Sequence, residues 1–361
     1  MIRLEKRPQP SQGWVIGGPI LAVLLTMVAG GAMFALLGAD PVEAMRVIFW
    51  DPLFSERFAG FSRPQLLVKA GPLILIAIGL SLGFRAGIWN IGAEGQYIVG
   101  ALFGAAFGLA FWPSEHPLLF PGMVLAGLWG GFLWAMIPAL LKVYARTNEI
   151  LVSLLLVYVA EAILASAATG WLRNPEGSGF PGSRNLARHP GTDNPELIAG
   201  TGMHWGVLVA FVAVIAAYVL MNRHILGYQI KLAGQAPRAA RFGGVNPARL
   251  VILCLGISGA LAGAAGLFEV AGPAGQITID FNAGYGFTAI IVAFLGRLNP
   301  IGILLAGLLM ALTFIGGELA QLLLGLPAPS IQAFQGMLLF FLLALDVLAN
   351  YRVRWGREVA A

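Results

Sequence analysis

Long apolar segments recur along the chain and constrain its fold more than any other feature. A segment of about 20 apolar residues can cross a bilayer as a helix, which pairs every backbone polar group within the segment. We predict nine such helices and a tenth, shorter one that forms a half-helix near residues 284–296. The nine long segments are residues 14–37, 66–83, 87–111, 118–141, 150–172, 204–221, 250–271, 301–324 and 331–348.

The composition agrees with a membrane protein. Hydrophobic residues make up 58% of the 361 residues and charged residues 11%, with a mean hydropathy of +0.81. A soluble domain carries about 25% charged residues, so a soluble fold is excluded. The one cysteine, Cys254, excludes an internal disulfide and a cysteine-based metal site. We therefore predict an all-α polytopic membrane protein in which residues 1–361 form a single transmembrane domain.

Positive charge is distributed unequally among the connecting loops. If the N-terminus is cytoplasmic and ten segments alternate, fifteen of the 22 lysines and arginines face the cytoplasm, and both termini lie there. Five of these basic residues fall in the short connection 222–249. We expect residues 1–13 to be a cytoplasmic tail, residues 173–203 an extracytoplasmic loop and residues 222–249 a cytoplasmic loop.

Residues 84–97, F-R-A-G-I-W-N-I-G-A-E-G-Q-Y, are polar where a membrane helix should be apolar. If residues 87–111 form one helix, Asn90, Glu94 and Tyr97 share one of its faces. A carboxylate facing lipid is costly, so this face should look into protein or water. Two interpretations of Glu94 stay open: a hydrogen bond to a neighbouring helix, or a direct role in a transport pathway.

Glycine is arranged to allow close helix packing. The segment 87–111 carries a repeated G-x-x-x-G pattern at Gly100, Gly104 and Gly108. Small residues at this spacing let two helix backbones approach closely in a membrane. We expect this face to be a packing surface.

A short sequence pattern occurs once in each half of the chain. Ala86-Gly87 precedes the third segment, and Ala283-Gly284 precedes the short eighth one, each followed by aromatic residues. Two five-helix halves of opposite orientation would produce this pattern, and glycine-interrupted segments at matching positions indicate the transport site. We therefore expect the substrate pathway to be lined by Trp89, Asn90, Glu94, Tyr97, Tyr285 and Phe287.

Three common motifs of catalytic, nucleotide-binding and zinc sites are missing from the sequence. It contains no G-x-x-x-x-G-K-[ST] phosphate-binding loop, no H-E-x-x-H zinc motif and no G-x-S-x-G nucleophile motif. We find no catalytic constellation and predict no cofactor and no metal site. A polytopic membrane enzyme is accordingly the weakest of three functional hypotheses.

Several segments resemble one family of membrane proteins. They are G-F-R-A-G-I-W-N-I-G-A-E-G-Q at 83–96, T-N-E-I-L-V-S-L-L-L at 147–156 and G-Y-G-F-T-A-I-I-V-A-F-L-G-R-L-N-P at 284–300. They resemble permease subunits of bacterial ABC importers, in the branch for branched-chain amino acids, ribose and other simple sugars, and nucleosides. The loop R-N-P-E-G-S-G-F-P at 173–181 is most similar to the nucleoside subgroup. The likeness runs from about residue 15 to residue 350.

The resemblance implies the partners of the chain. Such a permease works in the bacterial inner membrane with a second permease chain, an ATPase subunit with two nucleotide-binding domains and an extracytoplasmic substrate-binding protein. Residues 225–249 resemble the cytoplasmic coupling loop that docks a helix into the ATPase. We expect that helix near 237–242, started by a proline and ended by a glycine pair. The expected coupling residues are Pro237, Arg238, Arg241, Phe242, Gly243 and Gly244.

Our first hypothesis is thus the permease subunit of an ATP-driven importer, which forms the translocation pathway for a nucleoside or a simple sugar. The alternative is an ion-coupled secondary transporter, in which an intramembrane carboxylate carries a proton: Glu94, Glu161, Glu269 or Glu318. The aromatic residues do not identify the substrate, because a nucleobase and a sugar ring both stack on flat faces.

Overall fold

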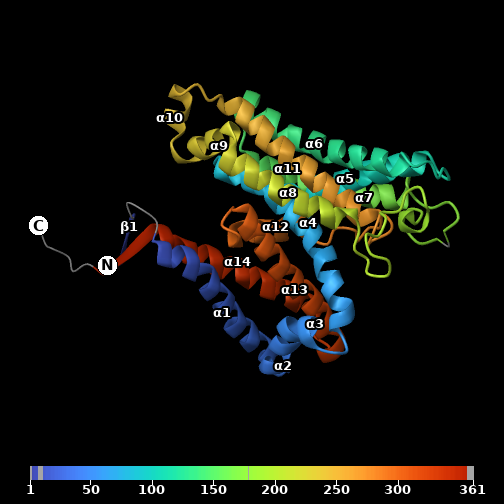
Figure 1. The fold of residues 1–361 in the computed structure, drawn as a ribbon, viewed down its shortest axis with the longest axis horizontal. Helices are drawn as coiled ribbons and strands as arrows, with labels where there is room; N and C mark the ends of the chain where they lie inside the picture. Colours follow the sequence, from blue (N-terminus) through green and yellow to red (C-terminus); the bar gives the residue numbers. More distant parts are fainter. Residues whose placement is uncertain (1, 7–10, 178, 356–361) are drawn as a thin grey trace, which may run out of the picture. The chain divides into compact units, whose positions relative to one another are not determined.

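The computed structural model describes residues 2–6, 11–177 and 179–355 (Figure 1). Part of the predicted cytoplasmic tail 1–13, and the basic residue Arg357 of the other tail, lie outside them. The chain forms two compact units, Met1–Ser62 with Leu312–Ala361, and Arg63–Ala311. The predicted all-α polytopic class is confirmed, because the elements are mainly long apolar helices.

The first unit is built on α1 (Gln12–Leu36) and α14 (Ala328–Asn350), which pack along each other. The Phe34 and Phe334 rings stack with their centroids 5.9 Å apart. Short helical turns follow α1, namely α2 (Pro41–Met45), the π-helical turn η1 (Arg46–Trp50) and α3 (Asp51–Phe54). Two strands that the sequence did not predict, β1 (Ile2–Lys6) and β2 (Tyr351–Trp355), pair antiparallel.

The second unit holds the candidate site and most of the remaining helices. α4 (Ala59–Arg85) leads into this unit and α13 (Pro300–Leu324) leads out of it. Figure 1 shows α9 and α10 at one end of the unit and the loop between α7 and α8 at the other. The helices between are α5 (Ala93–Ala110), α6 (Leu119–Ala145), α7 (Glu149–Thr169), α8 (Trp205–Arg223), α9 (Ile225–Gln235), α10 (Pro237–Phe242), α11 (Pro247–Val270) and α12 (Tyr285–Leu295).

Glycines allow α5, α6 and α11 to meet backbone against backbone. A Cβ on Gly100 of α5 would overlap the Cα of Gly263 in α11. A Cβ on Gly131 of α6 would overlap the carbonyl oxygen of Gly259, also in α11. The predicted packing face of the third segment is therefore confirmed, and α6 and α11 supply matching glycines that the sequence analysis did not single out.

The expected segments correspond to helices, with one correction and one addition. Eight described helices are long and apolar enough to cross a membrane; α5, of 18 residues, and α12, of 11, are not among them. The count of ten spans and the two inverted halves remain predictions. The segment 87–111 was wrongly taken as one helix, because α5 begins at Ala93 and residues 86–92 form a turn. The helix α9 was not predicted.

The glycine contact between α5 and α11 can be tested by adding one methyl group. We expect Gly100→Ala to lower the free energy of unfolding by about 1–3 kcal/mol, because the backbones must separate to admit it. Thermal unfolding of the purified protein measures this loss. The control is Gly336→Ala on α14, where a Cβ meets no atom within 4 Å and a helical alanine is favoured over glycine. Equal unfolding temperatures for the two variants would contradict the close contact.

Candidate functional site

The carboxylate of Glu94 binds the N-terminus of another helix. Glu94 lies in the first turn of α5 and is 1% exposed. Its Oε1 accepts the N–H of Gly284 at 3.1 Å, its Oε2 accepts the N–H of Gly286, and the backbone N–H of Phe287 is a third donor to it. The first N–H groups of a helix have no partner within the helix and carry its positive end, so an anion is favoured there. Glu94 therefore holds the start of α12.

Gly286 is required by the same contact. A Cβ on this residue would overlap the backbone nitrogen of Glu94, so α12 meets α5 at a distance that only glycine allows. Of the two interpretations of Glu94, the hydrogen bond to a neighbouring helix has its partners in this structure. A direct pathway role for Glu94 stays a prediction.

Asn90 closes the turn that precedes α5. Its Oδ1 accepts the N–H of Gly92 at 3.1 Å, and its Nδ2 donates to Ser258 Oγ of α11 at 3.0 Å. Asn90 and Gln96 also exchange two amide hydrogen bonds, of 2.9 and 3.2 Å. Both side chains are 1% exposed and satisfied. The prediction that Asn90 shares a helical face with Glu94 is wrong, because Asn90 precedes the helix.

Two further polar contacts secure the segment that begins α12. Glu161 of α7 accepts a hydrogen bond from Asn282 Nδ2 at 2.9 Å. Lys69 of α4 donates to the hydroxyl of Tyr285 at 3.1 Å. Together with Glu94, these side chains connect residues 282–286 to three helices. The sequence analysis proposed Glu161 as a proton carrier but did not identify this structural role.

The aromatic residues of the predicted pathway fall into two clusters. Tyr97 stacks on Phe281 and meets Tyr285 edge-on, with ring centroids 5.3 and 5.8 Å apart, and both tyrosines are buried. Trp89 packs against Phe84 and Phe294, the latter near the end of α12. The structure thus brings Glu94, Tyr97 and Tyr285 together at the start of α12, and places Trp89 at its other end.

The six predicted pathway residues differ in how much of their side-chain surface is exposed. Trp89 and Phe287 each keep 40% of their surface exposed. The other four are at most 1% exposed: Asn90, Glu94, Tyr97 and Tyr285. Only the first two therefore offer side-chain surface to a ligand in this conformation.

The two glycines of the pattern shared by the two halves, Gly87 and Gly284, have the same backbone conformation. Gly87 has a φ of +74° and Gly284 a φ of +75°, in the left-handed region that favours glycine. Each lies shortly before a helix that begins within the unit, α5 and α12. Seven other described glycines also have a positive φ, so the relation between the two halves stays a prediction.

A helix is present at the position predicted for coupling, with its expected ends, and its coupling role stays a prediction. α10 begins at Pro237 and ends at the cap residue Gly243, and Gly244 takes the left-handed φ of +82°. Phe242 is 98% exposed, and Arg238 and Arg241 are also exposed. These side chains do not serve the packing of the unit.

The preceding helix α9 connects this element to the turn before α5. A Cβ on Gly234 would overlap the carbonyl oxygen of Arg85, so α9 lies directly on the end of α4. A cavity of about 240 Å³ lies beside this contact, and its lining includes Gly87, Pro237 and Arg241. α9 and α10 therefore lie beside the turn that Asn90 closes.

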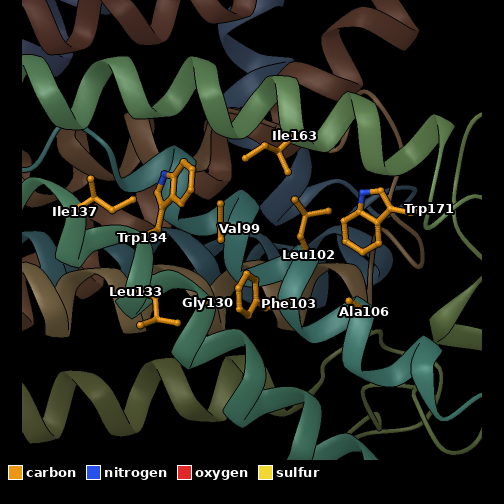
Figure 2. A pocket seen from close by; sticks show the side chains of 10 residues that line it. All are labelled: Val99, Leu102, Phe103, Ala106, Gly130, Leu133, Trp134, Ile137, Ile163 and Trp171. Atoms are coloured by element: carbon orange, nitrogen blue, oxygen red, sulfur yellow. The ribbon is translucent and has the colours of Figure 1, made fainter.

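An apolar groove lies between α5, α6 and α7 (Figure 2). Its volume is about 440 Å³, and its lining is apolar apart from the two indole groups of Trp134 and Trp171. The buried Nε1 of Trp134 has no hydrogen-bond partner. Because no lining side chain supplies a hydrogen-bond acceptor, the groove does not suit a polar substrate.

Comparison with known proteins connects the chain to membrane transport. The profile of the family described as branched-chain amino acid transport system, permease component, matches residues 63–343. The chain is 35% identical to a glucose ABC transporter permease protein of Haloferax volcanii, over 98% of this chain and 93% of the relative. It is 26% identical to a nucleoside ABC transporter permease protein of Lactococcus lactis, over 90% and 89% of the two chains. It is also 26% identical to a guanosine ABC transporter permease protein of Bacillus subtilis, over 93% and 94%. No solved structure matches the chain.

The contact between Glu94 and α12 predicts unequal effects of two matched substitutions. We expect Glu94→Gln to lower the free energy of unfolding by about 1.5–3 kcal/mol, because an amide has one acceptor oxygen and no charge for the helix end. Glu161→Gln keeps the acceptor that Asn282 needs, so we expect a loss of about 1 kcal/mol or less. Thermal unfolding of the purified variants measures both. Wild-type stability of Glu94→Leu would contradict the anchoring role.

Proposed function

Because the chain belongs to the family of branched-chain amino acid transport system permease components, it is a permease subunit of an ABC importer, and we propose that it imports a nucleoside or a simple sugar. The observation that carries the substrate class is the near full-length similarity to permeases named for glucose, nucleosides and guanosine. A multi-pass protein of the plasma membrane agrees with its apolar helices.

We propose that α12 borders the substrate pathway and that the six predicted residues have two kinds of role. Trp89 and Phe287 present exposed aromatic surface, which can stack on a base or a sugar ring. The buried residues act by position: Glu94 and Tyr285 at the start of α12, Tyr97 against them and Asn90 in the preceding turn. A half-helix held at one end by side chains is suited to shift between two positions.

We propose that α10 docks into an ATPase subunit and that α9 transmits the movement. Phe242 is an exposed aromatic residue that follows the basic residues Arg238 and Arg241, and an exposed aromatic residue is the kind that anchors an interface. The close contact of Gly234 with Arg85 then links docking to the turn before α5. ATPase and substrate-binding partners follow from the family in general; the second permease chain and the paired nucleotide-binding domains are part of the proposal.

Two of the four carboxylates of the secondary-transporter alternative, Glu94 and Glu161, have structural hydrogen-bond partners. Both oxygens of Glu94 accept backbone N–H groups, and Glu161 accepts from Asn282. These carboxylates are engaged as acceptors at the start of α12, which is a structural role. We also propose that the chain has no enzymatic activity of its own and that ATP is hydrolysed in a separate chain.

The docking role of α10 is tested by one substitution at its exposed aromatic residue, Phe242. We expect Phe242→Asp to weaken ATPase binding by at least about tenfold, because a charged side chain replaces the apolar anchor. Thermal stability should not change, since Phe242 is 98% exposed. Co-purification of the ATPase with the tagged permease, followed by uptake in cells, measures the effect.

The control uses the same substitution in the other large loop. Phe180 is 81% exposed and lies in the loop between α7 and α8. Phe180→Asp should retain the ATPase at the wild-type level. Equal retention of the ATPase by both variants would remove α10 as the docking element.

The proposed orientation is tested by labelling two exposed positions. We expect an impermeant maleimide to label Ala199→Cys in intact cells, and Ala239→Cys only after lysis, in a Cys254→Ala background. Ser183 of the same outer loop and Ala240, which follows Ala239, are 3% and 2% exposed and are therefore unsuitable for labelling. Labelling of position 239 but not 199 in intact cells would reverse the orientation, and with it the cytoplasmic placement of α10.

A further inference from the structure

The apolar groove between α5, α6 and α7 ends beside a basic cavity. Figure 2 shows Ile137 at one end of the groove and Trp171, which follows α7, at the other. Trp171 also lines a cavity of about 310 Å³, whose other lining residues include Arg173 and Arg184. The groove and the cavity therefore have a wall residue in common.

A stripe of apolar residues on α5 also connects the groove with the cavity. Leu102 and Ala106 line the groove, and Leu109 lines the cavity. Because these residues stand at positions i, i+4 and i+7, they lie on one face of the helix. The groove and the cavity thus follow each other along the last turns of α5.

The groove is open at the surface of the second unit. Phe103, Leu133 and Trp171 line it and are exposed, Trp171 by 62%. Both α6 and α7 are long and apolar enough to cross a membrane, so this surface meets lipid unless another chain covers it. Because lipid chains are as apolar as leucine, the groove accepts an acyl chain without selecting a particular lipid.

The charge of the cavity can supply the selection. Arg184 lies over the Trp112 ring, with Cζ 5.2 Å from the ring centroid, and pairs with the exposed Glu176 at 2.9 Å. An exposed ion pair of this kind is weak, and a guanidinium has five N–H donors. Arg173 is exposed and donates to the carbonyl oxygen of Gly179 at 3.3 Å. Among the described residues that line the cavity, none is acidic.

The residues of the cavity suit the headgroup region of a bilayer. Tryptophan is enriched at the level of the headgroups, and both Trp112 and Trp171 line the cavity. A guanidinium binds phosphate through two parallel hydrogen bonds. The arginines would repel the ammonium group of a zwitterionic headgroup. An anionic phospholipid therefore matches the cavity better than a zwitterionic one.

We propose that the groove and the cavity together bind an anionic phospholipid, with an acyl chain in the groove and the phosphate in the cavity that Arg173 and Arg184 line. This lipid site does not depend on which substrate the permease transports. In the proposed orientation the lipid belongs to the outer leaflet of the membrane. It lies against α5 and α7, the helices whose Glu94 and Glu161 hold the segment that begins α12.

Replacing one arginine tests the phosphate contact. We expect phosphatidylglycerol to bind the purified full-length permease about tenfold more tightly than phosphatidylcholine with the same acyl chains, as measured by native mass spectrometry. Arg173→Gln should reduce this preference to about twofold or less, because glutamine keeps an amide donor but loses the charge. Arg188→Gln is the matched control, since Arg188 is exposed in the same loop and does not line the cavity. An equal loss in both variants would indicate general surface charge and overturn the site.

Filling the groove tests the acyl-chain contact. Ala106→Phe places a ring in the groove, and we expect it to weaken phosphatidylglycerol binding by at least about fivefold. Ala110→Phe is the matched control, because Ala110 is the exposed last residue of α5 and lines neither the groove nor the cavity. Thermal unfolding confirms that each variant is folded.

Three further outcomes would overturn the lipid site. The first is an equal affinity of the wild type for the two lipids. The second is unchanged phosphatidylglycerol binding in Ala106→Phe together with a loss in Arg173→Gln, because the phosphate would then bind without the acyl chain. The third is a cross-link between two permease chains through Leu133→Cys in a Cys254→Ala background, which would show that a second chain covers the groove.

Discussion

The structure of the second unit depends on one carboxylate that binds the first turn of a short helix. α12 has 11 residues and its first N–H groups lie inside the protein, where water does not satisfy them. Glu94 supplies the acceptors, and its negative charge meets the positive end of the helix. The same contact satisfies the buried carboxylate, so each group removes the cost of burying the other.

The polar contacts of the unit follow a continuous path through this helix. At one end, α9 lies on the end of α4 through Gly234, and the next residues form the turn that Asn90 closes. Glu94 follows at the start of α5 and holds α12. The connection from α11 to α12 is paired with the loop 173–203 at the other end. The contacts at both ends of the unit therefore converge on the segment that begins α12, and a connection of this kind is needed for coupling between two distant sites.

Periodicity and composition predicted the parts of this structure that are local in the chain. The apolar segments, the glycine packing face of α5 and the ends of α10 follow from neighbouring residues, and each is present. The partner of Glu94 did not follow, because Gly284 and Gly286 are about 190 residues away and offer only backbone N–H groups. The turn before α5 was missed because the i, i+4 spacing of Asn90 and Glu94 indicates one helix. In the structure Asn90 exchanges hydrogen bonds with Gln96 instead, and this pairing cannot be read from the spacing.

Two buried asparagines differ in how much of their hydrogen-bonding capacity they use within the chain. Asn90 and Gln96 hydrogen-bond each other, and Asn90 also accepts the N–H of Gly92. This pair is therefore a structural part of the fold. Asn194 donates its two amide hydrogens to Phe268 and His204, and its Oδ1 is buried without a hydrogen-bond partner. Both residues are nearly inaccessible, so burial alone does not distinguish them. The distinction lies in how much of its hydrogen-bonding capacity each residue uses within the chain, because a satisfied buried group stabilises the fold and an unsatisfied one costs free energy.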